Sequence, residues 1–307
     1  MKKAIVTGAN GFIGKWLVKE LVEHHVEVYA IVHTPSKCFS NIPSDMLHVI
    51  SCDMEHIDEL KEKIQEKNLD VFFHLAWAGS TGSARSDYSL QLQNVKWTCD
   101  AVRVASQLGI HKFVGAGTLA EIDCNSYIPE DGSTPNGVSC YGSAKIAAHY
   151  MSKAIASQLK IEHVWAYLSN TYGEGNQTQN FVNFASKLML SGQKAAFTSG
   201  EQPYDFVYVS DSAQGLRCIG ESGKNMCSYY IGSGKAKQLK EYIYMIRDAI
   251  DPKIKLYLGE IPFHGNMLPD TVFSCEKLCK DTGYSPRVPF EEGIRETIEW
   301  LRKGEKA

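Results

Sequence analysis

The stretch Thr7-Gly8-Ala9-Asn10-Gly11-Phe12-Ile13-Gly14 decides how the first half of this 307-residue chain folds. It follows a short apolar run at residues 4–6 and precedes a segment with helical spacing of apolar residues at 12–24. Gly8 permits a tight turn, Gly11 lets the backbone approach a pyrophosphate, and Gly14 allows the helix to pack closely. The free N–H groups at the start of that helix would face the phosphates. A glycine triad at such a strand-to-helix junction predicts a dinucleotide-binding βαβ unit.

Strand-like and helix-like segments alternate through the first half of the chain. Parallel strands buried on both faces give near-continuous apolar runs, and consecutive ones need a crossover connection that is usually a helix. The alternation therefore predicts an α/β fold with a Rossmann-type doubly wound parallel sheet. The expected strands are residues 4–6, 26–32, 71–75, 112–114 and 161–168, with another before Asp53, and the expected helices are 12–24, 57–67, 90–108 and 141–159.

The rhythm loosens after about residue 169, where glycines and prolines separate short elements. A strand at 206–209 and a closing helix at 290–301 are the clearest of these elements. We therefore expect residues 1–168 to form the dinucleotide-binding domain. Residues 169–307 are expected to form mainly a smaller C-terminal α/β domain that binds the substrate, with some segments returning to the first domain.

Composition and charge exclude several classes of partner. The 32 basic and 35 acidic residues give a net charge of −3 without long blocks of one sign, which argues against nucleic acid. No apolar run approaches the roughly 18 to 20 residues that span a bilayer, and the start of the chain lacks a signal-peptide pattern. Nine scattered cysteines form no Cys-x-x-Cys pair, which indicates reduced thiols, no metal site and a cytoplasmic protein.

Residues 32–37, at the end of the second predicted strand, bear on the choice of dinucleotide. An acidic residue at this place binds the ribose 2′-hydroxyl of NAD and repels a 2′-phosphate. The stretch Val32-His33-Thr34-Pro35-Ser36-Lys37 contains no carboxylate. Its polar side chains are either ordinary loop residues or donors to a phosphate, and the sequence favours NADP(H) slightly over NAD(H). The four candidate donors are His33, Thr34, Ser36 and Lys37.

The stretch Tyr141-Gly142-Ser143-Ala144-Lys145 carries the most informative pair of side chains. A tyrosine and a lysine four residues apart lie on the same face of a helix. A nearby ammonium favours the phenolate and lowers the tyrosine pKa toward working pH, as general acid–base catalysis requires. The pair therefore predicts an acid–base centre at Tyr141, although the same spacing also occurs in incidental surface pairs.

Together with the glycine loop, this pair resembles the extended short-chain dehydrogenase/reductase superfamily, the NAD(P)-dependent nucleotide-sugar epimerases, dehydratases and reductases. The resemblance covers nearly the whole chain. His74-Leu75-Ala76-Trp77 is similar to the end of the family's fourth strand, and Asn170-Thr171-Tyr172-Gly173 to the segment that enters the substrate half. Thr118, 23 residues ahead of Tyr141, takes the place of the family's third catalytic hydroxyl.

The resemblance implies hydride transfer between a sugar carbon and nicotinamide. Tyr141 would give or take the proton on a sugar oxygen, Lys145 would bind the nicotinamide ribose, and Thr118 would hydrogen-bond the same sugar oxygen. It also implies a homodimer in which helices 90–108 and 141–159 pair across a twofold axis. The implied dinucleotide contacts are Gly8, Asn10, Gly11, Phe12, Ile13, Gly14, His33, Asp53, Met54, Leu75, Ala76, Trp77, Asn94, Tyr141 and Lys145, and the implied substrate contacts are Ala78, Thr118, Glu121, Asn170, Asn180, Phe181 and Tyr204.

Departures from the family's pattern narrow the reaction. Its dehydratases carry an Asp-Glu pair directly after the catalytic threonine, where this chain has Leu119-Ala120, and enzymes that epimerise and then reduce have a cysteine at the position of Ala120. What remains is reduction of a 4-keto nucleotide sugar, with a 6-deoxy sugar favoured. The alternative is a 4-epimerase of the UDP-glucose 4-epimerase type with tightly bound NAD. A dinucleotide-sensing regulator is disfavoured, because such proteins typically lose the tyrosine–lysine pair.

The substrate half lacks several arginines that the family uses to bind anions. Tyr167 and Tyr204 stand where the family has arginine, and a later arginine is replaced near His264. A diphosphate-linked sugar needs cationic partners, so other cations are expected to take over. The candidates among the lysines are Lys187, Lys194, Lys235 and Lys237.

Overall fold

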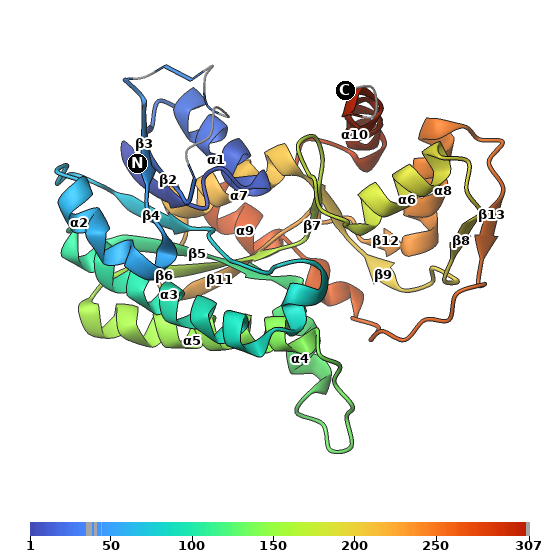
Figure 1. Ribbon diagram of the computed structural model, residues 1–307, viewed down its shortest axis with the longest axis horizontal. Helices are drawn as coiled ribbons and strands as arrows, with labels where there is room; N and C mark the ends of the chain where they lie inside the picture. The colour runs from blue at the N-terminus through green and yellow to red at the C-terminus, as the bar shows by residue number, and fades with distance from the viewer. Residues whose placement is uncertain (35–38, 40–41, 44, 305–307) are drawn as a thin grey trace.

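The computed structural model describes residues 1–34, 39, 42, 43 and 45–304. Its centre is a seven-stranded sheet whose neighbouring strands all run parallel, in the order β11-β6-β5-β4-β1-β2-β3 (Figure 1). The order reverses between β1 and β4, and doubly wound sheets bind their ligands at this switch point. The strands are β1 (Lys3–Thr7), β2 (Glu27–Val32), β3 (Leu47–Ser51), β4 (Val71–His74), β5 (Lys112–Thr118), β6 (Glu162–Leu168) and β11 (Cys227–Ile231).

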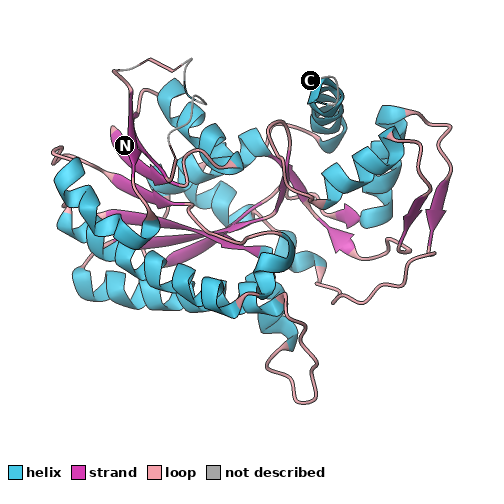
Figure 2. Cartoon of the chain, in the orientation of Figure 1, coloured by secondary structure: helices cyan, strands magenta, loops and turns pink. Residues whose placement is uncertain are grey.

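Helices cover both faces of the sheet (Figures 1 and 2). On one face, α1 (Phe12–Glu23), α7 (Val209–Ser222) and α9 (Glu276–Thr282) enclose an apolar core with the sheet. On the other face, α3 (Tyr88–Gln107) and α5 (Ser139–Leu159) lie side by side over a second core. The Rossmann-type doubly wound sheet predicted from the sequence is therefore confirmed.

β5 continues to Thr118, beyond the strand predicted at 112–114. Glycine inside a strand normally weakens it, so Gly115 and Gly117 argued against a strand over residues 115–118. A Cβ at either glycine would come within 2.2 Å of the Trp165 side chain on neighbouring β6. The two glycines therefore make room for a large buried indole, and β5 reaches the edge of the sheet where the site lies.

The helix predicted at 57–67 is wrong from residue 64 onward. The Glu66 carboxylate accepts hydrogen bonds from the backbone N–H groups of Lys67 and Asn68, at 2.8 and 2.9 Å, and pairs with the ammonium of Lys3. Such side-chain bonds to the local backbone compete with the helix, so the chain leaves helical geometry before Glu66. The segment forms only η2 (Met54–Glu59) and α2 (Leu60–Lys63).

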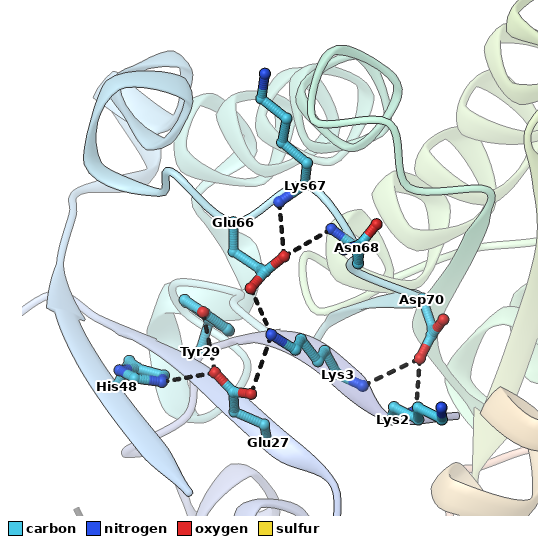
Figure 3. A network of polar contacts seen from close by, with 9 residues as sticks. All are labelled: Lys2, Lys3, Glu27, Tyr29, His48, Glu66, Lys67, Asn68 and Asp70. Atoms are coloured by element: carbon cyan, nitrogen blue, oxygen red, sulfur yellow. Dashed lines mark hydrogen bonds and ion pairs between the residues drawn. The ribbon is translucent and has the colours of Figure 1, made fainter. Parts of the chain in front are cut away.

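The Lys3–Glu66 pair belongs to a polar network that ties together the amino ends of neighbouring strands (Figure 3). The Lys3 ammonium lies 3.2 Å from Glu27 Oε2, and Glu27 Oε1 accepts from the Tyr29 hydroxyl at 3.1 Å. His48 Nε2 lies 2.8 Å from the same oxygen. Because these are the amino ends of β1, β2 and β3, the network lies at the edge opposite the switch-point site and holds strand register.

Beyond β6 the chain forms smaller elements beside the sheet, on the right of Figure 1. Three two-stranded ladders pair β7 with β10, β9 with β12, and β8 with β13. An aromatic core that includes Phe206, Tyr242 and Phe290 holds them against the helices. These elements are β7 (Asn170–Tyr172), β8 (Ala195–Phe197), β9 (Pro203–Tyr204), β10 (Phe206–Tyr208), β12 (Lys237–Gln238), β13 (Leu256–Leu258), α6 (Phe181–Leu190), α8 (Leu239–Ile250), η4 (Asp270–Phe273) and α10 (Phe290–Gly304).

Two further elements lie close to the carboxyl ends of the central strands. They are η3 (Gly82–Ser86), in the loop between β4 and α3, and α4 (Leu119–Tyr127), directly after β5. Neither was predicted from the sequence, and both contribute residues to the site. Within the described ranges, no helix is long and apolar enough to cross a membrane.

Candidate active site

The predicted glycine loop joins β1 to α1 at the switch point. Gly8 has a φ of +66°, and a Cβ there would come within 2.8 Å of the backbone N of Ala76. A Cβ on Gly14 would come within 2.1 Å of the Gly8 carbonyl oxygen. No described side chain caps the helix at Gly11, so its first N–H groups have no intrahelical acceptor and form an anion-binding end. These groups belong to Phe12, Ile13 and Gly14.

A second group of predicted dinucleotide contacts gathers at the carboxyl ends of β2 and β3. The Asn10 amide donates to the Thr34 carbonyl at 3.3 Å, which ties the glycine loop to the end of β2. His33 Nδ1 lies 2.8 Å from Asp53 Oδ2, and Met54 follows Asp53 at the start of η2. A carboxylate from the turn after β3 therefore reaches the end of β2, although the carboxyl end of β2 has no carboxylate of its own. Ser36 and Lys37 lie outside the described residues.

The loop between β4 and α3 is held down by two buried amides of α3. Asn94 accepts from the backbone N–H of Ala78 at 2.8 Å and donates to its carbonyl at 2.9 Å. Gln91 accepts from the Trp77 indole N–H at 2.9 Å and donates to the carbonyls of Gly79 and Ala84 at 2.9 and 3.0 Å. These bonds fix the backbone of the loop at Ala78, and the contacts of Asn94 with dinucleotide and of Ala78 with substrate stay predictions.

Tyr141 and Lys145 lie on the buried face of α5, as their spacing predicts. The Lys145 ammonium donates to the Ala116 carbonyl at 2.7 Å and lies 3.8 Å from the centroid of the Trp77 ring. Burial lowers the pKa of Lys145 to about 7. Burial also raises the pKa of Tyr141, while a hydrogen bond with Thr118 and the charge of Arg85 oppose that rise.

Thr118 ends β5 and caps α4, which places its hydroxyl beside Tyr141. Its backbone N–H donates to Glu121 Oε1 at 2.8 Å in a capping box. Glu121 is 1% exposed, and its two oxygens also accept from the Trp165 indole at 3.2 and 3.1 Å. Its carboxylate is thus buried among protein donors and fixes Thr118, and the substrate contact of Glu121 stays a prediction.

The predicted substrate contacts on the second half of the chain lie on β7, α6 and β9. Asn180 caps α6 by accepting from Asn183 N at 2.8 Å, and Asn170 donates to the Asp205 carbonyl at 3.3 Å. Phe181 and Tyr204 belong to one aromatic cluster, with ring centroids 6.5 Å apart. Burial raises the pKa of Tyr204. The charge of Asp123 adds to this rise, and the charge of Arg85 opposes it. Tyr204 is therefore close enough to Arg85 for the arginine's charge to act on its hydroxyl.

Arg85 is the residue near Tyr141 that the sequence did not reveal. It lies on η3, and its guanidinium carbon is 4.6 Å from the centroid of the Tyr141 ring. Nothing in the spacing of residues 79–87 distinguishes this arginine from an ordinary loop cation. The only available signal was a cation in the loop after the strand that passes beneath the dinucleotide.

The residues at the switch point fit a bound dinucleotide. The glycine loop has no space for side chains, the start of α1 offers open N–H groups, and Lys145 brings an ammonium to the same edge of the sheet. No group of three His, Cys, Asp or Glu side chains in the described part of the chain could hold a metal ion. A parallel Rossmann sheet with Thr118, Tyr141 and Lys145 at this edge defines a short-chain dehydrogenase/reductase.

Comparison with known proteins specifies the family. The model of the NAD dependent epimerase/dehydratase family matches residues 4–232, more than half of the chain, and the chain therefore belongs to this family. It is similar to a dTDP-4-dehydro-6-deoxyglucose reductase of Escherichia coli, at 25% identity over 313 residues that cover 97% of each protein. A putative UDP-glucose 4-epimerase of Methanocaldococcus jannaschii is 25% identical over 318 residues, covering 98% of this chain and 99% of the relative.

A solved structure shows the same fold. The UDP-N-acetylglucosamine 4-epimerase of Methanobrevibacter ruminantium, in complex with UDP-N-acetylmuramic acid, superposes with a TM-score of 0.81. Its sequence is 22% identical, and the match covers 99% of both chains. This likeness concerns the fold, and the resemblance to the extended short-chain dehydrogenase/reductases seen in the sequence is confirmed.

Proposed function

We propose that this protein reduces a 4-keto nucleotide sugar, with a 6-deoxy sugar as the favoured substrate. The observation that carries the proposal is the set of groups around Tyr141. Thr118, Tyr141 and Lys145 supply what proton transfer at one sugar oxygen requires, and neither of the two residues directly after Thr118 is ionisable. Leu119 and Ala120 occupy the positions where elimination or carbon-acid epimerisation would need an ionisable group.

The chain's own residues would act on the oxygen of the reacting carbon. In the reductive direction Tyr141 donates its hydroxyl proton to the developing alkoxide, and the Thr118 hydroxyl stabilises the same oxygen by a hydrogen bond. Lys145 holds positive charge beside the tyrosine and contacts the ribose that carries nicotinamide. The dinucleotide, when bound, supplies the hydride.

A 4-epimerase is the second candidate, favoured by the same three catalytic residues. Oxidation and re-reduction at one carbon need no further acid or base, so the site is competent for both reactions. The deciding experiment gives the purified protein dTDP-4-dehydro-6-deoxyglucose with NADH or NADPH, and in parallel UDP-galactose without added dinucleotide. We expect oxidation of the reduced dinucleotide in the first reaction. Net formation of UDP-glucose in the second would overturn the reductase proposal in favour of the epimerase.

The choice of dinucleotide depends on two opposing features. The absence of a carboxylate among residues 32–37, at the end of β2, favours NADP(H), whereas Asp53 brings negative charge to His33 and opposes a 2′-phosphate. Because the carboxylate is in direct contact with the candidate phosphate donor, we propose that NAD(H) binds at least as tightly as NADP(H). Titration of protein fluorescence with NADH and NADPH tests this, and Asp53→Asn should improve NADPH binding selectively. Tighter binding of NADPH to the unmodified protein would contradict it.

We also propose a homodimer formed through α3 and α5. Tyr88 and Leu92 on α3 and Tyr150 and Met151 on α5 are more than half exposed, which is an unusual concentration of large apolar side chains. Light scattering should give twice the mass of the chain, and Leu92→Glu with Met151→Glu should give the single mass. Phe184→Glu on α6 is the matched control, because it removes an exposed aromatic ring from another surface.

A further inference from the structure

Arg85 occupies a position beside the catalytic tyrosine that the reaction as proposed does not use. Its guanidinium carbon lies 4.6 Å from the centroid of the Tyr141 ring. Trp77 contacts the same ring edge-on, with centroids 6.0 Å apart and planes at 89°. Tyr141 is therefore in contact with an aromatic ring and with a permanent cation, and both come from the loop between β4 and α3.

The guanidinium of Arg85 has a hydrogen-bond donor without an acceptor in the part of the chain that the structure describes. Its Nε is shielded from solvent and has no hydrogen-bond partner among the described residues. The charges of Asp123 and Arg85 both act on the Tyr204 hydroxyl. The Asp123 carboxylate, however, accepts a hydrogen bond from the Asn266 amide at 3.2 Å. A guanidinium has five N–H donors in a fixed fork, and an unsatisfied donor that is shielded from water is unfavourable. Arg85 is thus arranged to receive oxygen acceptors from outside the chain.

The backbone that carries Arg85 is fixed. The carbonyls of Gly79 and Ala84 both accept from the Gln91 amide, which is itself buried on α3. Asp87, which follows η3, caps α3 by accepting from Leu90 N at 3.1 Å. A cation on such a segment keeps its distance from Tyr141, whereas a cation on a free loop would move into solvent. This is the preorganisation that substrate positioning requires.

The chain lacks arginine at two positions where the resemblance to the family predicts it for binding the substrate. Tyr167 and Tyr204 stand where arginines were expected, and Tyr204 is close enough to Arg85 for the charge to affect its hydroxyl. We propose that Arg85 is a substrate-positioning residue that donates hydrogen bonds to the oxygens on the sugar ring beside the carbon that reacts at Tyr141. This rests on the proposed function, because it assumes a sugar substrate. The diphosphate is not its partner, since Arg85 lies against the tyrosine at which the sugar reacts.

Binding measurements on three ligands test the assignment. Arg85→Met keeps the length of the side chain and removes its charge and donors, and Arg85→Lys keeps the charge without the fork. For Arg85→Met we expect affinity for dTDP-4-dehydro-6-deoxyglucose or UDP-galactose to fall by about tenfold or more, as for a lost charge-assisted hydrogen bond. Affinity for the nucleoside diphosphate alone and for NADH should stay unchanged. Arg85→Lys should recover part of the loss.

Two outcomes would overturn the assignment. Equal weakening of the nucleoside diphosphate would make Arg85 a diphosphate ligand, and unchanged sugar binding would leave it without a role in the substrate site. Arg103→Met is the matched control, because Arg103 is an exposed arginine on α3 and should affect none of the three ligands. Thermal unfolding of each variant establishes that the comparison concerns folded protein.

Tyrosinate absorbance gives a readout that needs no substrate. The difference between titrations of the unmodified protein and Tyr141→Phe reports the ionisation of Tyr141, and Arg85→Met should move it to higher pH because a cation near the ring favours the phenolate. If the unmodified protein binds no nucleotide sugar, the proposed function fails. If Tyr141 titrates at the same pH in Arg85→Met, the placement of this cation beside Tyr141 fails independently of the substrate.

Discussion

The ammonium of Lys145 lies 3.8 Å from the centroid of the Trp77 ring, so an indole packs directly against this lysine. A cation over an aromatic face is stabilised by roughly 0.5 to 2 kcal/mol. Burial already lowers the pKa of Lys145 to about 7, and loss of the ring should lower this pKa further. In Trp77→Leu we expect the alkaline limb of kcat/KM to move to lower pH by up to about one unit.

Trp77→Phe separates the aromatic face from the indole N–H. Phenylalanine keeps a ring beneath Lys145 but cannot donate to Gln91 Oε1, which accepts from Trp77 at 2.9 Å. Its pH profile should therefore resemble that of the unmodified protein, although its stability should fall. An equal displacement of the alkaline limb in both variants would mean that the aromatic face does not hold the charge of Lys145.

Tyr141→Phe should remove the proton donor without disturbing the fold. The hydroxyl makes its hydrogen bond to Thr118, and the ring keeps its contacts with Trp77 and Arg85. Loss of a positioned general acid typically costs about 10² to 10⁴ in rate, and we expect kcat to fall within this range. Dinucleotide affinity should be retained. Turnover close to that of the unmodified protein would contradict the assignment of Tyr141.

Gly142 is required where α4 and α5 meet, directly after Tyr141. A Cβ at this position would come within 2.3 Å of Cys124 Sγ and 2.6 Å of the Ala120 carbonyl oxygen. Gly142→Ala should therefore lower the free energy of unfolding by about 1 to 3 kcal/mol, as overpacking does, and reduce kcat by displacing Tyr141. Gly304→Ala on α10 meets no atom within 4 Å and should leave both quantities unchanged. Urea denaturation measures the difference.

The buried His74 should lower the free energy of unfolding in mild acid. It is buried beneath the site, with Nδ1 2.9 Å from the Thr7 hydroxyl, and burial together with the Lys145 charge lowers its pKa to about 3. The unfolded chain binds a proton at this histidine below about pH 6.5, whereas the folded chain does not until about pH 3. Stability is therefore lost as the pH falls through this window, by up to about 1.4 kcal/mol per pH unit.

Variants at two histidines test this pH dependence. In His74→Gln the free energy of unfolding should fall less steeply between about pH 6.5 and 3, whereas His264→Gln, at an exposed site, should keep the slope of the unmodified protein. His163 is also buried with its pKa lowered to about 3, so part of the slope should remain in His74→Gln. An unaltered slope in His74→Gln would contradict the prediction.

Variants of Glu121 test whether its carboxylate has a structural role or binds the substrate. Glu121→Ala leaves the Trp165 indole and the Thr118 N–H without their acceptor, which should cost about 1 to 3 kcal/mol in stability. Because Thr118 then loses its fixed position, kcat should fall while KM for the sugar substrate changes little. Glu121→Gln retains an acceptor and should lie between the two proteins. A raised KM with unchanged stability would instead indicate direct contact with substrate.

Much of the fold could be predicted from the sequence, because its determinants are local. The glycine loop follows from a turn that needs positive φ at Gly8 and from a helix start that needs space at Gly14. The parallel sheet follows from apolar runs alternating with helices, and the shared face of Tyr141 and Lys145 follows from helical geometry. Each of these depends on neighbours in the chain, so the residues themselves carry the information.

Only the tertiary structure decided which side chains meet across the fold. Glu66 pairs with Lys3 at the start of β1, although 63 residues separate them in the chain. Glu121 accepts from Trp165 because β5 and β6 are adjacent and the glycines of β5 admit the indole. Arg85 lies over Tyr141 because Gln91 fixes its loop. Such contacts depend on long-range packing and on the burial of charge, and no local pattern encodes them.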